Sequence, residues 1–445
     1  MRVLFLEVDT ESSWAVASLG PAMLASYLRK FGHDPRFMRV PLDWLADDVV
    51  GRVRAEAPDL VALSLTTRQW LRARGIVANL RAAVDVPVVA GGLHPTFSPE
   101  AVLAADGFDY VCRGEGEEAL LDLVGAIAAG QRPATVRIPG IWGRGGPAPS
   151  LRPPFEPLDA LPFMARDFLD ERHGVVHLTT QRGCPFKCTY CAARMYNELY
   201  QDTGTYGRRR SHRNVLSELA AIRDQGPLNY VIFLDDTFTI NHPWVNEFCR
   251  VYGSELRIPF SLHARVETVS ERLLERLAAA GCRHITYGVE SGSERIRREV
   301  MRRPVANQRF VDVFRWTRQA GILVTANYMM GLPTETPAEM AETLSLHQEL
   351  EPDDFGYFVF YPYPGTHLYQ LCVADGYLPE NHLDLPANHR TSVLRLPTLT
   401  QDDIHACYQK WTAVRALRAV GRSGDISGIE ERAVVAQIEH CAANG

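Results

Sequence analysis

Short apolar runs alternate with amphipathic stretches along the N-terminal third of the chain. Each of five apolar runs precedes a stretch with helical spacing of apolar positions; the runs cover residues 2–8, 35–40, 59–65, 86–92 and 108–114. Strands that alternate with helices form a parallel sheet covered on both faces. The pattern therefore predicts an α/β fold with a Rossmann-like, doubly wound parallel sheet over residues 1–132.

The same alternation resumes after a segment rich in Pro and Gly. Six further apolar runs are strand candidates, at residues 175–181, 230–236, 260–266, 282–290, 322–330 and 355–364. Six such units predict an open, partial (β/α)6 barrel over residues 173–374. Residues 133–172 are expected to form a linker that lies across the surface, and residues 375–445 a helical C-terminal tail.

The composition is that of a soluble globular protein, with 46% hydrophobic and 22% charged residues. No run approaches the roughly 18 apolar residues of a membrane span. The N-terminal apolar run meets acidic residues too early for a signal peptide. The net charge is −6 and the basic residues are scattered, so we expect a cytoplasmic protein with no nucleic-acid partner.

Three of the nine cysteines lie in one short segment, QRGCPFKCTYC, at residues 181–191. Cys184, Cys188 and Cys191 follow the first strand of the barrel region, on the face where a barrel builds its active site. A structural zinc site needs four ligands, and no fourth Cys or His lies near with the usual spacing. Three thiolates suit a [4Fe–4S] cluster with one open iron. The spacing favours this cluster over zinc or coincidence.

The CxxxCxxC spacing, with Tyr190 before the last cysteine, resembles the signature of radical S-adenosylmethionine (SAM) enzymes. In that family the open iron binds the amino and carboxylate groups of SAM. Reduction of the cluster then cleaves SAM to a 5′-deoxyadenosyl radical. The resemblance implies SAM as a second cofactor and a flavodoxin- or ferredoxin-type protein as electron donor.

The resemblance extends to the ends of the later strands. In FLDDTFTIN, Asp235 and Asp236 replace the Gly-Gly-Glu that contacts the SAM amino group, with helix capping as the alternative. In YGVESGSERI, Glu290 is expected to bind the ribose hydroxyls, with Ser291 beside it. The other expected SAM contacts are Tyr190, Arg265, Met330 and Gly331. An ordinary ion pair at Arg265 and core packing at Met330 are the alternatives.

The first sheet resembles the cobalamin-binding domain of cobalamin-dependent radical SAM enzymes. The resemblance rests on GGLHPTFSPE (residues 91–100), RGEGE (residues 113–117) and the domain order. A Gly-Gly turn lets a corrin or nucleotide tail approach the backbone. The expected cobalamin contacts are Thr66, Thr67, Arg68, Gly91, Gly92, His94, Gly114, Glu115 and Gly116. The DxHxxG motif is absent, so we expect no histidine on cobalt.

The two cofactors together imply radical chemistry at an unactivated carbon. We expect methylation of an sp³ carbon of a small, natural-product-like substrate, with the methyl group taken from methylcobalamin and that carrier remade from a second SAM. Tyr361 and Tyr363 are expected to line the substrate cavity, unless they are core aromatics. The alternative is oxidative cyclisation or ring rearrangement with the same cofactors.

Two further classes are disfavoured. Methylthiotransferases hold a second cluster on three N-terminal cysteines, whereas the N-terminal region has only Cys112. A cofactor-sensing regulator is the non-enzymatic alternative, and the complete set of expected SAM contacts argues against it.

Overall fold

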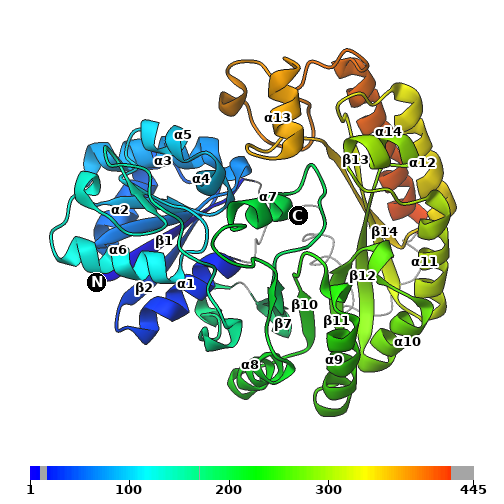
Figure 1. Ribbon diagram of the computed structural model, residues 1–445, viewed down its shortest axis with the longest axis horizontal. Coiled ribbons are helices and arrows are strands. Elements are labelled where there is room, and N and C mark those ends of the chain that lie inside the picture. Colours follow the sequence, from blue (N-terminus) through cyan, green and yellow to red (C-terminus); the bar gives the residue numbers. More distant parts are fainter. Residues whose placement is uncertain (11–17, 170, 422–445) are drawn as a thin grey trace.

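The computed structural model describes residues 1–10, 18–169 and 171–421. Two six-stranded sheets form its two main bodies, with α7 (Ala192–Leu199) placed between them (Figure 1). The first sheet occupies the N-terminal body. The second sheet curves into a partial barrel, as the strand pattern predicted.

The first sheet has the strand order β2-β1-β3-β4-β5-β6. Its parallel strands are β1 (Arg2–Val8), β2 (Asp34–Val40), β3 (Leu60–Ser64), β4 (Val88–Gly91) and β5 (Tyr110–Cys112). The last strand, β6 (Ile141–Gly143), runs antiparallel to β5 and comes from the segment expected to be a linker. The helices are α1 (Leu19–Lys30), α2 (Ala46–Glu56), α3 (Thr67–Ala83), α4 (Leu93–Phe97), α5 (Pro99–Ala104) and α6 (Glu117–Ala128).

Alternation along β1 shows why helices cover both faces of the first sheet. Val3 and Phe5 pack in one core with residues of α1 and α6, whereas Leu4 and Leu6 pack in a second core with α2 and α3. Successive side chains of a strand point to opposite faces, so a fully apolar strand needs a helical layer on each side. This confirms the doubly wound sheet.

The second sheet is parallel, with the order β14-β13-β12-β11-β10-β7. The strands are β7 (Val175–Leu178), β10 (Tyr230–Phe233), β11 (Phe260–Ala264), β12 (Cys282–Glu290), β13 (Leu323–Met330) and β14 (Asp354–Val359). Its outer helices are α8 (His212–Gln225), α9 (His242–Glu255), α10 (Glu271–Ala280), α11 (Asn307–Gln319) and α12 (Pro337–Leu350). These helices follow the convex side of the sheet in Figure 1.

The C-terminal part closes the far end of the barrel sheet. α13 (His367–Ala374) follows β14 and lies above α7 in Figure 1. The long helix α14 (Gln401–Gly421) packs on β14 and α12, with Trp411 buried against Tyr328 and Phe355. The predicted helical C-terminus is therefore confirmed for its described part.

Candidate functional site

The three cysteines of the CxxxCxxC segment lie together beyond the end of β7. Cys184 and Cys188 are buried, and Cys191 is the half-buried N-cap of α7. The side-chain amide of Asn197 in α7 donates a 2.7 Å hydrogen bond to the Cys184 carbonyl oxygen. All three thiols are free. The loop thus gathers three sulfur ligands at the carboxyl ends of the barrel strands.

The electrostatics of these thiols fit a cluster site. Burial, the charge of Asp236 and the other two thiols raise the pKa of Cys191 to about 12. Burial also raises the pKa of Cys184. Coordinated iron supplies the positive charge that three thiolates need. Among the described residues no three His, Cys, Asp or Glu side chains surround a single ion; in a cluster, each cysteine binds a different iron.

Arg265 lies directly beside the cysteine loop. Its Nη1 donates to Cys188 Sγ at 3.0 Å, its guanidinium stacks on the Phe186 ring, and its Nη2 pairs with Glu267. Its buried Nε has no hydrogen-bond partner among the described residues. A guanidinium beside the cysteines whose Nε–H is unpaired fits the expected role of binding the SAM carboxylate.

Glu290 ends β12 on the same side of the sheet as Arg265. Tyr190 hydrogen-bonds to its carboxylate, and Arg303 lies 3.8 Å from it. Burial raises the pKa of Glu290, while the charges of Arg303 and Arg265 lower it. Glu290 has a left-handed backbone, with φ of +73°, a strained conformation for a residue with a side chain. The carboxylate is therefore held beside the cysteine loop, where a ligand hydroxyl can reach it.

Asp235 and Asp236 have different surroundings although they are adjacent. Asp235 is buried and accepts hydrogen bonds from the backbone N–H groups of Thr180 and Gln181, at 2.8 and 2.7 Å. Asp236 retains solvent-exposed surface. The protein around its carboxyl group nevertheless desolvates it, which raises its pKa. Asp235 thus fixes the chain that leads into the cysteine loop. Asp236 alone faces the thiols.

The polar residues at the end of β3 bond mainly to the first domain itself. Thr66 caps α3 and donates to Gln69 Oε1 at 2.9 Å through its N–H. Thr67 Oγ1 lies 3.3 Å from His94 Nδ1, and the His94 ring stacks on Trp70. His94 is 1% exposed, and burial lowers its pKa to about 4. The unpartnered Nε2 is buried too, so a corrin cannot reach this imidazole without rearrangement.

The Gly-Gly turn after β4 brings two loops into close contact. Gly92 has φ of +92°, and a Cβ there would lie 2.8 Å from the Leu65 backbone nitrogen. A Cβ on Gly91 would meet the Cβ of Cys112 at 3.4 Å. The adjacent Leu93 is 38% exposed at this carboxyl end of the sheet. The turn offers a close-packed backbone and an apolar side chain, which fit a corrin.

The RGEGE segment connects the two bodies of the molecule. Glu115 pairs with Arg182 at 2.9 Å and with Arg208, and it accepts a hydrogen bond from the Phe155 N–H. A Cβ on Gly114 would collide with Tyr200 Oη at 2.1 Å, and Gly116 faces Leu24 of α1. Gly114, Glu115 and Gly116 are predicted cobalamin contacts. In the structure this loop makes an interdomain contact, and its contact with cobalamin stays a prediction.

One predicted cobalamin contact lies against the predicted substrate residues. Tyr363 hydrogen-bonds through its hydroxyl to His389 Nε2 at 2.6 Å, and its ring contacts the buried Tyr361. Burial and then the positive charge of Arg68 lower the pKa of His389 to about 4. Arg68 belongs to α3, whereas both tyrosines follow β14. The two bodies therefore face each other here.

Two family models match the chain. Residues 178–347 match the Radical SAM superfamily, and residues 13–124 match the B12 binding domain. The chain is a radical SAM enzyme with a B12-binding domain. These domains account for a [4Fe–4S] cluster, SAM and cobalamin, which confirms the three predicted cofactors.

Relatives resemble the chain across both domains. An uncharacterized methyltransferase of Pyrococcus horikoshii is 28% identical over 441 residues, covering 92% of this chain and 91% of the relative. The anaerobic magnesium-protoporphyrin IX monomethyl ester cyclase of Rubrivivax gelatinosus is 26% identical over 394 residues, covering 83% of this chain and 70% of the relative. The radical SAM methyltransferase TsrM from Kitasatospora setae, solved with cobalamin and a [4Fe–4S] cluster, shares the fold. Its TM-score is 0.68 at 19% identity, over 91% of this chain and 84% of that one.

Three predicted SAM contacts of this radical SAM enzyme do not face the cysteines in the structure. Ser291 is fully buried, and its Oγ accepts a hydrogen bond from the Ser293 N–H beside α12. Met330 lies in the core under the helices, and Gly331 donates its N–H to Glu335 Oε2 at 2.6 Å. The half-buried Met329 occupies the opposite face of β13.

Sequence reasoning missed the charged residues that hold Arg265 and Glu290 in place. Glu267 pairs with both Arg265 and the fully buried Arg303, and these charges lower its pKa to about 2 despite burial. Arg303 also contacts Glu290. Glu267 lies in the segment RVET and Arg303 in the segment MRRP. Only their contacts in the folded protein reveal their role.

Cys112 and the lengths of the helices concern two further predictions, on the N-terminal cysteine and on membrane spans. Cys112 is buried in β5, and burial raises its pKa to about 12, as in a core thiol. Within the described ranges, none of the helices combines the length and apolar character needed to cross a bilayer.

Proposed function

We propose that this enzyme methylates an sp³ carbon of a small molecule, using SAM, the [4Fe–4S] cluster and cobalamin. The supporting observation is the meeting of two sites. The cysteine loop lies beside Arg265, Glu290 and Asp236. The same loop is followed by α7, whose neighbour Tyr200 contacts the cobalamin-type domain at Glu115.

The cluster, when bound, supplies the electron that cleaves SAM, and cobalamin supplies a methyl carrier. The chain positions SAM between these groups. We assign the SAM carboxylate to Arg265, the SAM ammonium to Asp236 and the ribose hydroxyls to Glu290, with Tyr190 holding Glu290 in place. Each is a charge-assisted contact, which is about twice as strong as a neutral hydrogen bond.

We assign the substrate to the space bounded by the tyrosines after β14. Tyr361 is 4% exposed and Tyr363 is tied to His389. We expect these rings to exclude water around the reacting carbon. We retain the boundaries 1–132, 133–172, 173–374 and 375–445 for the domains, and a flavodoxin- or ferredoxin-type protein as the electron donor.

Oxidative cyclisation is the second candidate, because one similar protein is an anaerobic cyclase that matches 83% of this chain. Both candidates use the same cofactors. They differ in whether a second SAM is consumed to replace the methyl group.

The products of SAM separate the two candidates. The full chain is reconstituted anaerobically with iron, sulfide and cobalamin and supplied with SAM, a chemical reductant and candidate substrates. Equal amounts of S-adenosylhomocysteine and 5′-deoxyadenosine support methylation. 5′-Deoxyadenosine with no S-adenosylhomocysteine supports cyclisation. Formation of neither product would contradict both.

A further inference from the structure

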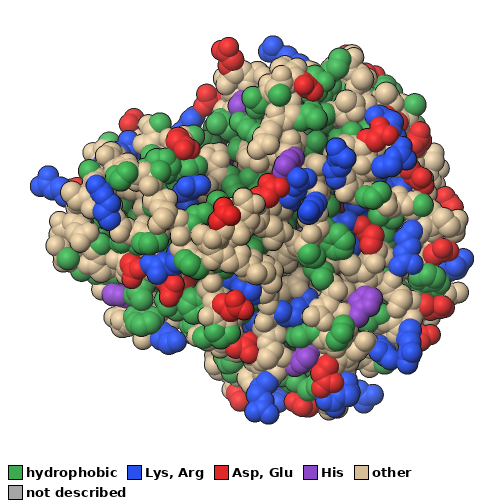
Figure 2. Space-filling model, viewed as in Figure 1, with side chains coloured by type: hydrophobic (Ala, Val, Ile, Leu, Met, Phe, Trp, Pro, Cys, Tyr) green, Lys and Arg blue, Asp and Glu red, His purple; other side chains and the backbone are tan. Residues whose placement is uncertain are grey.

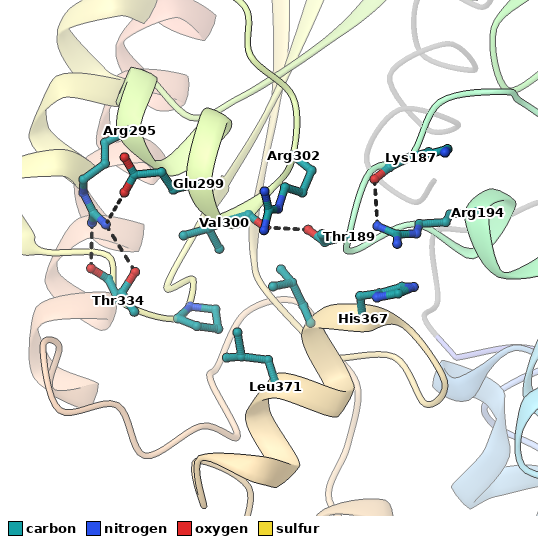
Figure 3. Close-up of a pocket in the computed structure, with 12 residues that line it drawn as sticks. Lys187, Thr189, Arg194, Arg295, Glu299, Val300, Arg302, Thr334, His367 and Leu371 are labelled. Atoms are coloured by element: carbon teal, nitrogen blue, oxygen red, sulfur yellow. Dashed lines mark hydrogen bonds and ion pairs between the residues drawn. The ribbon is translucent and has the colours of Figure 1, made fainter.

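Two cavities open on the outer side of the cysteine loop, on either side of Lys187 and Arg194. Each has a volume of about 730 Å³, and both residues line both cavities. Figure 3 shows the first cavity, with Lys187, Arg194 and His367 on one side and Arg295 and Arg302 across from them. Together the two cavities form a surface that we call the basic rim.

Basic side chains outnumber acidic ones along the basic rim, where Arg182 and Arg208 also pair with Glu115. Its Lys and Arg residues are Arg182, Lys187, Arg194, Arg208, Arg209, Arg295 and Arg302, and its acidic residues are Glu198 and Glu299. The whole chain has a net charge of −6, so this excess is local. Figure 2 shows Lys and Arg side chains gathered near the middle of this face, around α7 and α13.

Lys187 and Arg302 are the exposed cations of the rim that no described acidic residue neutralises. Arg194 pairs with Glu198, and Arg295 pairs with Glu339. Within the described part of the chain, neither the Lys187 ammonium nor the Arg302 guanidinium has an ion-pair partner within 4 Å. Both side chains are exposed. Unpaired exposed cations on one rim attract an anionic partner.

The backbone at Arg302 turns this cation outward. Arg302 has φ of +55°, directly after a π-helical turn at Ile296–Val300. The next residue, Arg303, is buried and pairs with Glu267. Left-handed non-glycine residues and π-turns both cost energy and are common at functional sites. The strained turn thus places one arginine inside the SAM site and its neighbour on the basic rim.

The location of the rim suggests what binds there. Cys184 and Cys188 are buried, whereas Pro185 and Lys187 between them are exposed. The rim is therefore where the cysteine loop reaches the surface. We propose that the basic rim is the docking surface for an acidic one-electron donor protein of the flavodoxin or ferredoxin class; this rests on the proposed function. One electron passes from the reduced donor to the cluster, with no bond made or broken.

A protein fits the rim better than a small anion does. The charges line two open cavities on both sides of a protruding loop, and the unpaired Lys187 and Arg302 are separated by Thr189 in Figure 3. A small anion would need convergent donors. An acidic protein face would span both cavities, with electrostatic steering that weakens as salt rises.

The test measures binding directly. Purified flavodoxin is titrated against the reconstituted full chain, and its Kd is measured from low to moderate salt. The double variant Lys187→Glu/Arg302→Glu should weaken Kd at least tenfold at low salt. The control Lys30→Glu/Lys410→Glu makes the same charge change on α1 and α14 and should leave Kd within twofold. SAM cleavage with a chemical reductant should remain in both.

The outcomes separate this proposal from the proposed function. Equal flavodoxin affinity in the wild type and the Lys187/Arg302 variant would overturn the docking surface. The same holds if millimolar inorganic phosphate binds the wild type and not the variant while flavodoxin affinity is unchanged. Failure of the wild type to cleave SAM with a chemical reductant would instead refute the proposed function. The milder Lys187→Gln and Arg302→Gln variants should each weaken Kd less, which checks against misfolding.

Discussion

The carboxyl ends of the two sheets differ in how their polar residues are used. At the barrel sheet, Arg265, Glu290 and Asp236 gather around the cysteine loop and keep charge that a ligand can use. At the first sheet, polar residues mostly satisfy each other: Thr66 bonds to Gln69, and Thr67 to His94. We therefore propose that the barrel binds SAM through charged side chains. The first sheet is suited to cobalamin through shape and backbone.

The difference follows from the ligands. SAM carries a carboxylate, an ammonium group and ribose hydroxyls, and each needs a specific partner in a buried site. The corrin ring of cobalamin has broad apolar faces, so a close-packed turn such as Gly91–Gly92 with Leu93 can pack against it. Substitutions should therefore act on chemistry at one site and on packing at the other.

The largest effect is expected at the cysteine loop. Changing Cys184, Cys188 or Cys191 to Ala should remove the cluster and abolish 5′-deoxyadenosine formation, because each thiolate holds one iron. Iron analysis and product quantification check this. Cys372→Ala, a buried cysteine in α13, is the matched control and should retain iron. A triple variant with full iron content would show that the ligands lie elsewhere.

A large stability effect is expected at the contact between the two bodies. Glu115→Ala leaves the buried Arg208 without an acidic partner and leaves Arg182 with Glu117 alone. Burial raises the pKa of Glu115, but these two arginines outweigh it and lower the pKa below its ordinary value. Breaking such a pair costs about 3–5 kcal/mol of unfolding free energy.

Urea unfolding checks this prediction against a nearby carboxylate. Glu118 pairs with Arg152 while 41% exposed, so Glu118→Ala should cost about 1 kcal/mol or less. Equal losses in the two variants would mean that Glu115 is not an interdomain anchor. Cobalamin affinity, measured under conditions where both variants are folded, should change little, because the loop contacts the barrel body.

A pH effect is expected at the end of β1. Glu7 is 5% exposed, and burial raises its pKa from 4.5 to about 7, against hydrogen bonds from Ser18 and Gln69. The folded protein therefore binds a proton that the unfolded chain has released between pH 4.5 and 7. Wild-type stability should fall as pH rises through this window, by a total of about 3 kcal/mol from this group.

Glu7→Gln keeps the size of the side chain and removes its titration. The variant should gain stability relative to the wild type as pH increases from 5 to 8, measured by urea unfolding at each pH. Parallel stability curves would show that Glu7 ionises normally in the folded protein. The carboxyl end of the first sheet would then hold an ionised carboxylate. The two sheets would differ less in their use of charged side chains.

The smallest of these effects is expected at the end of β12. Glu290→Gln replaces a charged acceptor and should weaken SAM binding by about 1.5–3 kcal/mol, or roughly 10- to 150-fold. The cluster should remain intact. Ser291→Ala is the matched control, because Ser291 faces α12, and its SAM affinity should stay within twofold. Calorimetric titration of SAM distinguishes the two variants. Equal losses of SAM affinity would indicate that Ser291 also contacts SAM.

The sequence predicts the strands of both sheets well because each is a compact apolar run. It misses β6, since three residues in a Pro- and Gly-rich segment carry no periodic signal. It locates the barrel site through the cysteine spacing and Glu290. It does not predict that Ser291 and Met330 are buried, because neighbouring residues near a strand end point in different directions, which one motif string does not reveal.

The loop RGEGE shows a second limit of sequence reasoning. Its glycines and acids suit a phosphate-containing ligand as readily as an interdomain contact, and only the positions of Arg182 and Arg208, distant in the chain, reveal the interdomain contact. Glu267 and Arg303 are missed for the same reason. Residues that act through partners far along the chain need the fold before their role is visible.

Electron paramagnetic resonance of the cob(II)alamin-loaded enzyme tests the contrast between the two sites most directly. His94 is buried against Trp70 with its Nε2 enclosed, so the account predicts no nitrogen superhyperfine splitting from a protein ligand. His94→Ala should leave the cobalt signal unchanged. Nitrogen splitting in the wild type that disappears in His94→Ala would contradict the account, because the first sheet would then hold its cofactor through a side chain as the barrel does.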